Sequence, residues 1–276
     1  MMRTSTTLDA FCHTDGVTIT VSTPSAIESW PIGPWRWGIN KTFHDPKFLE
    51  RLSTPQNLLL PPAEPVERIP PRTTTELVRL VLAEWPARPL FIKHYRPAKL
   101  WNTCKDCFRR SRARLAFENA LLLQRLNIHT ATPVAFGERR QWFFLQEAYL
   151  ICEEVPRAIT LKHFYLGCSD PWQCVTAVRS LARLMAALHN ARLSHSDPHD
   201  QNFLVSDGHC ENLVLIDLDA LRPQRWFGFR TAVRDLKKML QRSPLPARLH
   251  LRFAVEYARA RSTRLSARKL VWALGP

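Results

Sequence analysis

Two neighbouring segments, Leu193–Val205 and Leu213–Asp219, constrain this chain more than any other part of its sequence. The first is a polar loop in which Asn202 follows Asp197 by five residues, and the second is an apolar run that ends in carboxylates. A phosphoryl-transfer site needs one group that orients an attacking hydroxyl and oxygen ligands that hold Mg²⁺. Together the two segments predict such a site.

Three side chains are the candidates for this chemistry. We predict that Asp197 accepts a hydrogen bond from the acceptor hydroxyl and takes its proton late in the transfer. Asn202 can offer a neutral oxygen to a hard cation, and Asp217 can offer a carboxylate at the end of an apolar strand. His195 is expected to brace the loop. The alternative is an ordinary polar loop, but the helix predicted before it and the strand predicted after it weigh against that interpretation.

Zinc binding is a competing interpretation of His195 and His199, which lie four residues apart. Pro198 between them prevents the helix that would place both rings on one face. Cys104 and Cys107 are the one close pair among the 7 cysteines, and a structural zinc site would need a second pair. We therefore expect no zinc at either place. The odd number of scattered cysteines predicts reduced thiols.

Upstream of the loop, the sequence predicts a small sheet interrupted by one helix. The expected strands are Glu76–Leu82, Pro89–Tyr95, Gln141–Gln146 and Tyr149–Val155, the last two forming a hairpin. A turn is expected near Trp85, between the first two strands. The helix is expected at Ser111–Leu126, where apolar residues recur at intervals of three and four.

Two charged residues of this region stand out. Lys93 shares one face of its predicted strand with Phe91 and Tyr95, because side chains alternate between the two faces of a strand. Such a lysine either reaches out from a half-exposed strand or is held inside by an anion. Glu118 lies next to the apolar stripe of the predicted helix, a position where most acidic residues are simply solvated.

A helix with a clear start precedes the polar loop. Asp170 suits the N-cap and Pro171 the first turn, and Gln173 completes a capping-box pattern. The apolar stripe of this helix is Cys174, Val178, Leu181, Met185 and Leu188. After the loop, Thr231–Leu240 and Leu249–Ala260 are predicted to be basic amphipathic helices.

Positive charge is concentrated toward the C-terminal end of the chain. The net charge is +15, and from Arg222 onward there are 14 Lys and Arg against 2 acidic residues, which gives +12. A second basic cluster lies between Lys105 and Arg114. Such surfaces attract nucleic acid, anionic lipid headgroups or phosphorylated glycans, and a solvated basic face is the alternative. No apolar run approaches the roughly 18 residues of a membrane span, and the first residues lack a secretory signal, so we expect a cytoplasmic location.

The order of these parts resembles the protein-kinase-like superfamily, and its details most resemble the lipopolysaccharide core kinases, the Kdo and heptose kinases. The resemblance covers about residues 65–240. The matching stretches are Phe91–Tyr95, Ser111–Glu118, Tyr149–Glu154, His195–Asn202 and Leu215–Asp219. It implies a two-lobed α+β fold in which 63–155 form a small N-lobe sheet with one helix and 156–276 form a mainly helical C-lobe. Residues 1–62 would be an N-terminal extension, to which we assign no role.

The resemblance also implies a role for each site residue. The nucleotide-binding residues would be Lys93, Glu118, Glu153, Val155, Asn202 and Asp217. Among them, Lys93 would hold the α- and β-phosphates of ATP and pair with Glu118, and the backbone from Glu153 to Val155 would meet adenine. Asn202 and Asp217 would be the Mg²⁺ ligands.

The resemblance also implies that Asp197 is the catalytic aspartate. Asp235 would be a buried acid that anchors the catalytic loop from below. The implied enzyme is an ATP- and Mg²⁺-dependent kinase that phosphorylates a sugar hydroxyl of lipopolysaccharide core or a related glycolipid. It would act at the cytoplasmic face of the inner membrane, where the basic C-terminal segment would hold the anionic substrate and contact the membrane peripherally. Nucleic acid would then not be a partner.

Three features depart from the kinase pattern. No glycine occurs between Gly38 and Gly137, so the phosphate-covering loop before Lys93 is not glycine-rich and residues 70–75 must serve instead. Ser196 stands where many protein kinases have arginine, which argues against regulation by a phosphorylated activation loop. Asp219 replaces the glycine that follows the metal-binding aspartate. These departures keep two alternatives open: a kinase-fold enzyme for another small molecule or a protein, and a pseudokinase or basic binding module.

Overall fold

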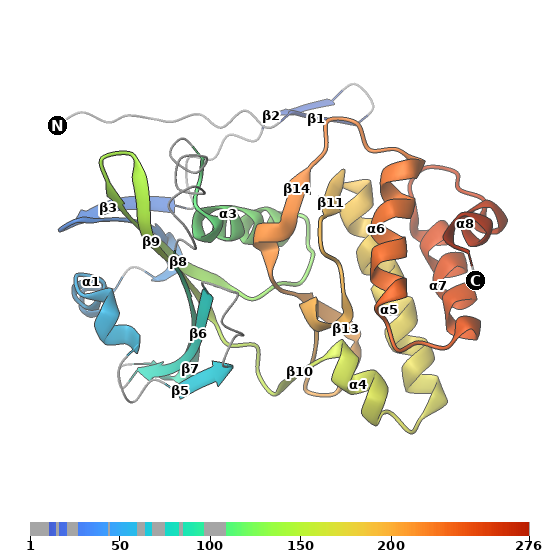
Figure 1. The fold of residues 1–276 in the computed structure, drawn as a ribbon, viewed down its shortest axis with the longest axis horizontal. Helices are drawn as coiled ribbons and strands as arrows, with labels where there is room; N and C mark the ends of the chain where they lie inside the picture. Colours follow the sequence, from blue (N-terminus) through green and yellow to red (C-terminus); the bar gives the residue numbers. More distant parts are fainter. Residues whose placement is uncertain are drawn as a thin grey trace. The chain divides into compact units, whose positions relative to one another are not determined.

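The computed structural model describes residues 11–14, 17–20, 27–43, 45–59, 64–67, 75–82, 85–96 and 109–275. The chain divides into two compact units. Unit 1 takes in the described residues between 20 and 121 and between 131 and 154. Unit 2 takes in those of 11–19, 122–130 and 155–275 (Figure 1). Among the residues described, we find no helix with both the length and the hydropathy that a membrane-spanning segment requires.

Unit 1 is built on one antiparallel sheet of seven strands in the order β3-β4-β8-β9-β7-β6-β5. The strands are β3 (Ile27–Ile32), β4 (Trp35–Asn40), β5 (Glu64–Glu67), β6 (Thr75–Leu82), β7 (Trp85–Tyr95), β8 (Pro133–Gln141) and β9 (Phe144–Glu153). Strand β8 was not among the predicted strands. Strand β9, which contains most of the predicted strand Tyr149–Val155, is central because it pairs with both β7 and β8. The predicted sheet with one long helix is therefore confirmed.

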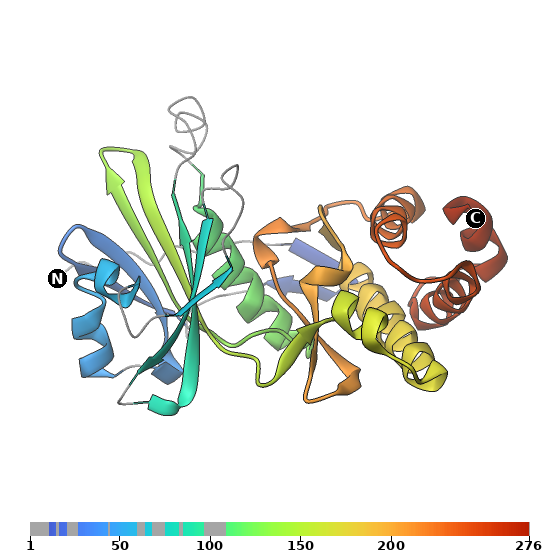
Figure 2. The ribbon, with the colours of Figure 1, turned by 60° about the horizontal axis from the view of Figure 1, so that its bottom comes forward.

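Each face of this sheet packs against different helices. On one face, Trp37, Ile39 and Ile151 form a core with Phe48 and Leu52 from the region of the short helix α1 (Pro46–Arg51). On the other face, a second core includes Phe117 and other residues of the long helix α3 (Arg112–Arg125). Figures 1 and 2 show α1 and α3 on opposite sides of the sheet.

The sequence predicted a hairpin between Gln141–Gln146 and Tyr149–Val155, and this prediction is wrong, because the second half of the first segment and most of the second segment lie in the single strand β9. The hairpin that the structure contains joins β8 to β9. The turn falls at Trp142 and Phe143, in the middle of the predicted strand Gln141–Gln146, and β8 lies before it. Both turn residues are large and apolar, yet 87% and 64% of their surfaces are exposed. Apolar composition therefore indicated a strand where the chain makes a turn. The predicted turn near Trp85 is also displaced, since β7 already begins at that residue.

Part of the predicted N-terminal extension belongs to the sheet. Strands β3 and β4 pair with each other, and β4 pairs with β8. Trp35 and Trp37 of β4 are almost completely buried in the core of unit 1. The predicted β-like run near Val17 is also a strand, since β1 (Phe11–Thr14) and β2 (Val17–Thr20) form a two-stranded sheet.

Two glycines make the β4–β8 pairing possible. Trp37 faces Gly137 across the strands, and Gly38 faces Phe136. A Cβ atom at Gly137 would lie 2.6 Å from the Trp37 ring, and one at Gly38 would lie 2.1 Å from the Phe136 ring. Each aromatic ring therefore occupies the space that a side chain on the facing residue would need.

Unit 2 combines five helices with short strands in the part of the chain that the structure describes. The helices are α4 (Leu161–Gly167), α5 (Pro171–Asn190), α6 (Phe229–Gln241), α7 (Ala247–Ala260) and α8 (Ala267–Leu274). The strands are β10 (Ala158–Thr160), β11 (Leu193–His195), β12 (Phe203–Ser206), β13 (His209–Leu215) and β14 (Leu221–Pro223). They form the sheets β10-β12-β13 and β11-β14.

Helix α5 is the central helix of unit 2. Asp170 caps it by accepting a hydrogen bond from the Trp172 amide at 2.9 Å, and Pro171 occupies its first turn, as predicted. Four of the five predicted stripe residues, from Val178 to Leu188, are fully buried. The helix contacts α7, β11 and β13, so it connects the basic helices to the strands that carry the polar loop.

We predict that Gly137→Ala destabilises the protein by about 1–3 kcal/mol, because the new methyl group overpacks against Trp37. Urea-induced unfolding measures this change. The control is Gly167→Ala at the end of α4, where a Cβ atom meets nothing within 4 Å; its effect should stay within about 0.5 kcal/mol. Equal effects of the two substitutions would contradict the close packing of β4 on β8.

Candidate active site

The polar loop of unit 2 runs from the end of β11 to the start of β12 and is held by its own hydrogen bonds. The Asp197 amide donates to Nδ1 of the buried His195 at 3.3 Å, which confirms that His195 braces the loop. The Asn202 side-chain amide donates to the Asp197 carbonyl at 2.9 Å. The Asn202 main-chain amide donates to the His199 carbonyl at 2.8 Å. These bonds fix the positions of Asp197 and Asn202 relative to each other.

The strand pair β12–β13 brings Asn202 and Asp217 to adjacent positions. Phe203 pairs with Leu215, and the Ile216 amide donates to the Asn202 carbonyl at 2.9 Å. Asp217 follows directly and has left-handed backbone angles, φ 60° and ψ 49°. A residue other than glycine adopts this conformation rarely, and aspartate is among the few that tolerate it. The chain therefore turns sharply at Asp217 into the short helix η4 (Leu218–Ala220).

The side-chain oxygens that this hairpin offers are of the type that binds a magnesium ion. The side-chain nitrogen of Asn202 is engaged by the Asp197 carbonyl, which leaves its oxygen Oδ1 for a cation. Asp217 would supply the second protein ligand, a carboxylate. Mg²⁺ in nucleotide sites usually takes one or two protein oxygens and completes its shell with phosphate and water. The described residues contain no group of three or more His, Cys, Asp or Glu that could hold a metal by themselves.

The Asp197 carboxylate is half exposed and lies beside two basic side chains. One oxygen accepts a hydrogen bond from Arg242, the residue that ends α6. The other lies 3.6 Å from Nε2 of His199. Sequence reasoning missed Arg242, because its only signal was its place in a generally basic segment. An acceptor hydroxyl would share the Asp197 carboxylate with this arginine.

A buried carboxylate supports the loop from α6. Asp235 is fully buried, and Ser194 Oγ donates to its Oδ2 at 2.6 Å. Arg234 donates to the other carboxylate oxygen at 3.2 Å and also to Ser194 Oγ at 3.2 Å. Burial by itself would raise the pKa of Asp235, but the interactions with His189 and Ser194 outweigh it and hold that pKa below its usual value. The prediction that Asp235 is a buried acid beside the loop is confirmed.

His189 of α5 completes this buried polar cluster. Its Nε2 lies 3.7 Å from Asp235 Oδ2, and its Nδ1 lies 2.6 Å from the Tyr257 hydroxyl. Burial lowers the pKa of His189 below 6.5; the Asp235 carboxylate opposes this shift and Arg261 adds to it. Below about pH 6.5 the unfolded chain therefore binds a proton at this histidine more readily than the folded protein does. The stability linked to His189 is complete above that pH and is lost as the pH falls.

We predict that His189→Asn lowers stability at about pH 8 by roughly 1–3 kcal/mol, because buried polar partners lose a hydrogen bond. The same substitution should reduce the further loss of stability between about pH 7 and pH 5.5, because the titrating group is gone. Denaturant-induced unfolding at several pH values measures both effects. His209→Asn, on the exposed part of β13, controls for the loss of an imidazole. If the stability of His189→Asn fell on acidification as much as that of the wild type, His189 would not be the source of the pH dependence.

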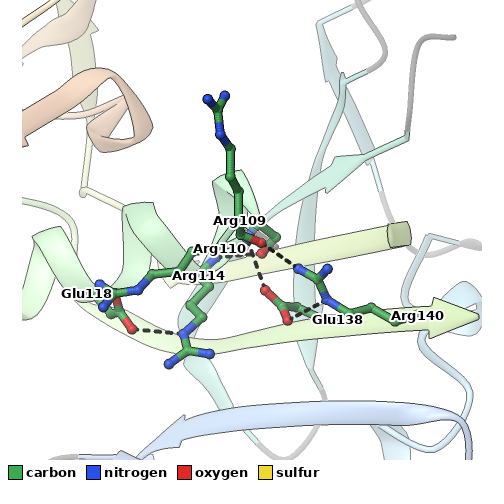
Figure 3. Close-up of polar contacts among 7 residues, drawn as sticks. Arg109, Arg110, Arg114, Glu118, Glu138 and Arg140 are labelled. Atoms are coloured by element: carbon green, nitrogen blue, oxygen red, sulfur yellow. Dashed lines mark hydrogen bonds and ion pairs between the residues drawn. The ribbon is translucent and has the colours of Figure 1, made fainter. Parts of the chain in front are cut away.

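Lys93 and Glu118 both lie in unit 1. Lys93 Nζ is 5.3 Å from the centre of the Tyr95 ring, which confirms that the two residues share one face of β7. The Glu118 carboxylate accepts hydrogen bonds from Arg110 at 2.7 Å and from Arg114 at 2.9 Å (Figure 3). The sequence did not predict these two partners. The pairing of Lys93 with Glu118 stays a prediction.

The start of α3 is tied to β8 by a second carboxylate, Glu138. It accepts hydrogen bonds from the Ser111 amide at 3.2 Å and from Arg140 Nε at 3.3 Å. Arg140 also donates to the Arg109 carbonyl at 2.9 Å (Figure 3). Two arginines of the basic cluster, Arg110 and Arg114, therefore have a carboxylate partner, so that cluster is partly a structural network. Lys105 lies outside the described residues.

The predicted nucleotide hinge coincides with the passage from unit 1 to unit 2, which occurs after Glu154. The Glu153 amide donates to the Thr132 carbonyl at 2.9 Å, and the Glu154 amide donates to the Pro89 carbonyl at 2.8 Å. Contact between adenine and the backbone from Glu153 to Val155 stays a prediction. Most of the predicted phosphate-covering segment, residues 70–74, lies outside the described residues, as do Cys104 and Cys107.

Comparison with known proteins identifies close counterparts of this architecture. The sequence profile of the lipopolysaccharide kinase (Kdo/WaaP) family matches residues 86–260. The solved structure of WaaP in complex with acyl carrier protein is similar with a TM-score of 0.54 and 22% identity, over 75% of this chain and 81% of that one. A pseudokinase mutant from Neurospora crassa gives a TM-score of 0.46 at 13% identity, over 84% of this chain and 64% of that one. A comparison with curated protein sequences gives no match. The predicted kinase-like α+β fold, with a sheet lobe and a mainly helical lobe, is thereby confirmed.

Proposed function

Because the chain belongs to the lipopolysaccharide kinase (Kdo/WaaP) family, we propose that it transfers the γ-phosphoryl group of ATP to a sugar hydroxyl. The acceptor is lipopolysaccharide core or a related glycolipid. The observation that carries this proposal is the fixed loop that presents Asp197 together with Asn202 and Asp217 at the ends of adjacent strands. Phosphoryl transfer depends mainly on positioning and charge stabilisation, which is what such a loop supplies.

In the proposed reaction, Asp197 accepts a hydrogen bond from the acceptor hydroxyl and aligns its oxygen with the γ-phosphorus. The bond between that phosphorus and the ADP oxygen breaks as the bond to the sugar oxygen forms, and the hydroxyl proton passes to Asp197 late in the step. Arg242 and His199, which lie beside the same carboxylate, orient it.

We assign nucleotide binding to the residues that the family resemblance implies. Lys93 contacts the α- and β-phosphates, with Glu118 as its partner, and the backbone from Glu153 to Val155 receives adenine. Asn202 and Asp217 hold Mg²⁺, which neutralises charge on the phosphates when it is bound. Asp217 lies in a left-handed turn at the end of the strand that precedes it.

Charge and family membership support the proposed substrate and location. The 14 basic residues from Arg222 onward suit an anionic glycolipid at the cytoplasmic face of the inner membrane, with peripheral contact between protein and membrane. An acyl carrier protein is a further candidate partner, because the WaaP structure was determined in complex with one.

A pseudokinase or basic binding module is the second candidate. The observation that favours it is the absence of glycine between Gly38 and Gly137, where active kinases usually have a glycine-rich loop. Backbone amides of other residues approach a phosphate less freely than those of glycine. Salt-dependent binding of nucleic acid without any nucleotide binding would favour this candidate.

We predict that Asp197→Asn lowers phosphoryl transfer from ATP to purified core glycolipid by about 10²–10⁴-fold, because the proton acceptor is lost. Transfer of radiolabelled γ-phosphate measures the rate. The exposed carboxylate of Glu211 on β13 provides the matched control, and Glu211→Gln should transfer at the wild-type rate. Equal rates for Asp197→Asn and wild type would contradict the assigned role.

We predict that Asp217→Asn removes most of the gain in nucleotide affinity that Mg²⁺ provides, because an anionic ligand of the cation is lost. Calorimetric titration with a non-hydrolysable ATP analogue, with and without Mg²⁺, measures this gain. In Glu211→Gln the gain should equal that of the wild type. If Mg²⁺ raised the nucleotide affinity of Asp217→Asn as much as that of the wild type, Asp217 would not be a ligand of the cation.

A further inference from the structure

Unit 2 contains a cavity of about 660 Å³ between the end of α4, the start of α5, and the chain from Pro244 into α7. Cavities that bind small molecules usually measure about 300–1,000 Å³. None of the residues proposed for catalysis, nucleotide binding or Mg²⁺ lines this cavity. It is therefore a separate candidate for a binding site.

The walls of the cavity are largely apolar. Val175 of α5, Leu245 and Leu249 are among the lining residues, and three prolines lie with them. Tyr165 of α4 also lines the cavity, and its buried hydroxyl has no hydrogen-bond partner among the described residues. An apolar chain would fit these walls, and the tyrosine hydroxyl could bond to a polar atom of the same ligand.

Two arginines give the cavity a positive edge. Arg248 and Arg252 both line it, and they lie on one face of α7 because they are four residues apart. Both are exposed, and neither makes an ion pair with any described residue. No Asp or Glu lines the cavity. The acid closest in sequence to its lining, Asp170, uses its carboxylate to cap α5. The edge formed by Arg248 and Arg252 therefore favours an anion.

Large apolar side chains are exposed in the same three helices. Leu166 of α4, Trp172 of α5 and Leu251 of α7 expose 66%, 76% and 55% of their surfaces. Each lies within two residues of a residue that lines the cavity. Exposed leucine and tryptophan close to arginine are typical of surfaces that take up amphiphilic molecules.

From these observations we propose that the cavity binds an alkyl or acyl chain that carries an anionic head group. The chain lies along the apolar walls, and Arg248 and Arg252 contact the head group. This site goes beyond the proposed kinase activity, since it requires neither nucleotide nor Mg²⁺. The ligand can come from a bilayer or exist as a free amphiphile, and both sources offer the same chemistry.

Two cysteines in the lining provide a direct test. Cys168 and Cys174 both line the cavity, so a bound chain should shield Cys168 from a maleimide reagent. Monomeric dodecyl phosphate, at about ten times its half-protecting concentration, should slow the labelling of Cys168 roughly tenfold. Mass spectrometry of the peptide that contains Cys168 measures the rate. The experiment contains no nucleotide, so its failure is distinguishable from failure of the kinase proposal.

Matched ligands and variants separate the contributions of the chain and the head group. Inorganic phosphate and an uncharged dodecyl glucoside should each protect Cys168 less than dodecyl phosphate does. Arg248→Gln combined with Arg252→Gln should abolish most of the protection. Arg264→Gln combined with Arg268→Gln removes the same charge at two other exposed positions. This variant should be protected at Cys168 as well as the wild type is. Thermal unfolding of each variant verifies that it is folded.

Vesicles identify the source of the ligand. Protection by vesicles that contain phosphatidylglycerol, but not by pure phosphatidylcholine vesicles, would support a bilayer lipid as the ligand. Protection by monomeric dodecyl phosphate alone would support a free amphiphile. The proposal is overturned if neither probe slows the labelling, if the glucoside protects as well as the phosphate, or if the Arg248/Arg252 double variant is protected like the wild type.

Discussion

The structure of unit 2 depends on one buried carboxylate, Asp235, and on the groups that compensate its charge. A charge without water is costly unless it is paired and hydrogen-bonded, and removing one partner of such a buried pair costs about 3–5 kcal/mol. Here the partners come from three different elements: Ser194 from β11, His189 from α5 and Arg234 from α6 itself. Satisfying Asp235 therefore brings these elements together. Because β11 leads directly into the polar loop, the same interactions determine where Asp197 lies.

The candidate cation site follows from a second local constraint, the pairing of β12 with β13. The pairing places Asn202 beside the chain that leads to Asp217, and the hydrogen bond from Asn202 to the Asp197 carbonyl selects which atom of the amide remains for a cation. One side chain thus connects the loop that carries the proposed proton acceptor to the strands that carry the proposed metal ligands. A substitution at Asn202 would affect both, so its loss of activity could not be assigned to either role alone.

The sequence predicted the features that depend on local periodicity and capping. The cap at Asp170, the buried stripe of α5 and the basic helices after the loop are all local patterns, and all are present. It failed where the outcome depends on distant partners or on solvent. Trp142 was assigned to a strand because it is apolar, although it is exposed in a turn. The pair of Arg114 with Glu118 was missed although its i,i+4 spacing on the predicted helix indicates it. The contacts of Arg110 with Glu118 and of Arg242 with Asp197 could not be predicted, because each depends on how side chains from separate elements are oriented.

The most direct test of the proposed phosphoryl transfer is the mass of core glycolipid from cells that contain or lack this protein. If Asp197, Asn202 and Asp217 form a phosphoryl-transfer site, the glycolipid carries one additional phosphoryl group only when the intact protein is present, and restoring the protein as Asp197→Asn does not return that group. An identical glycolipid mass with the intact protein, without it and with Asp197→Asn would contradict the account.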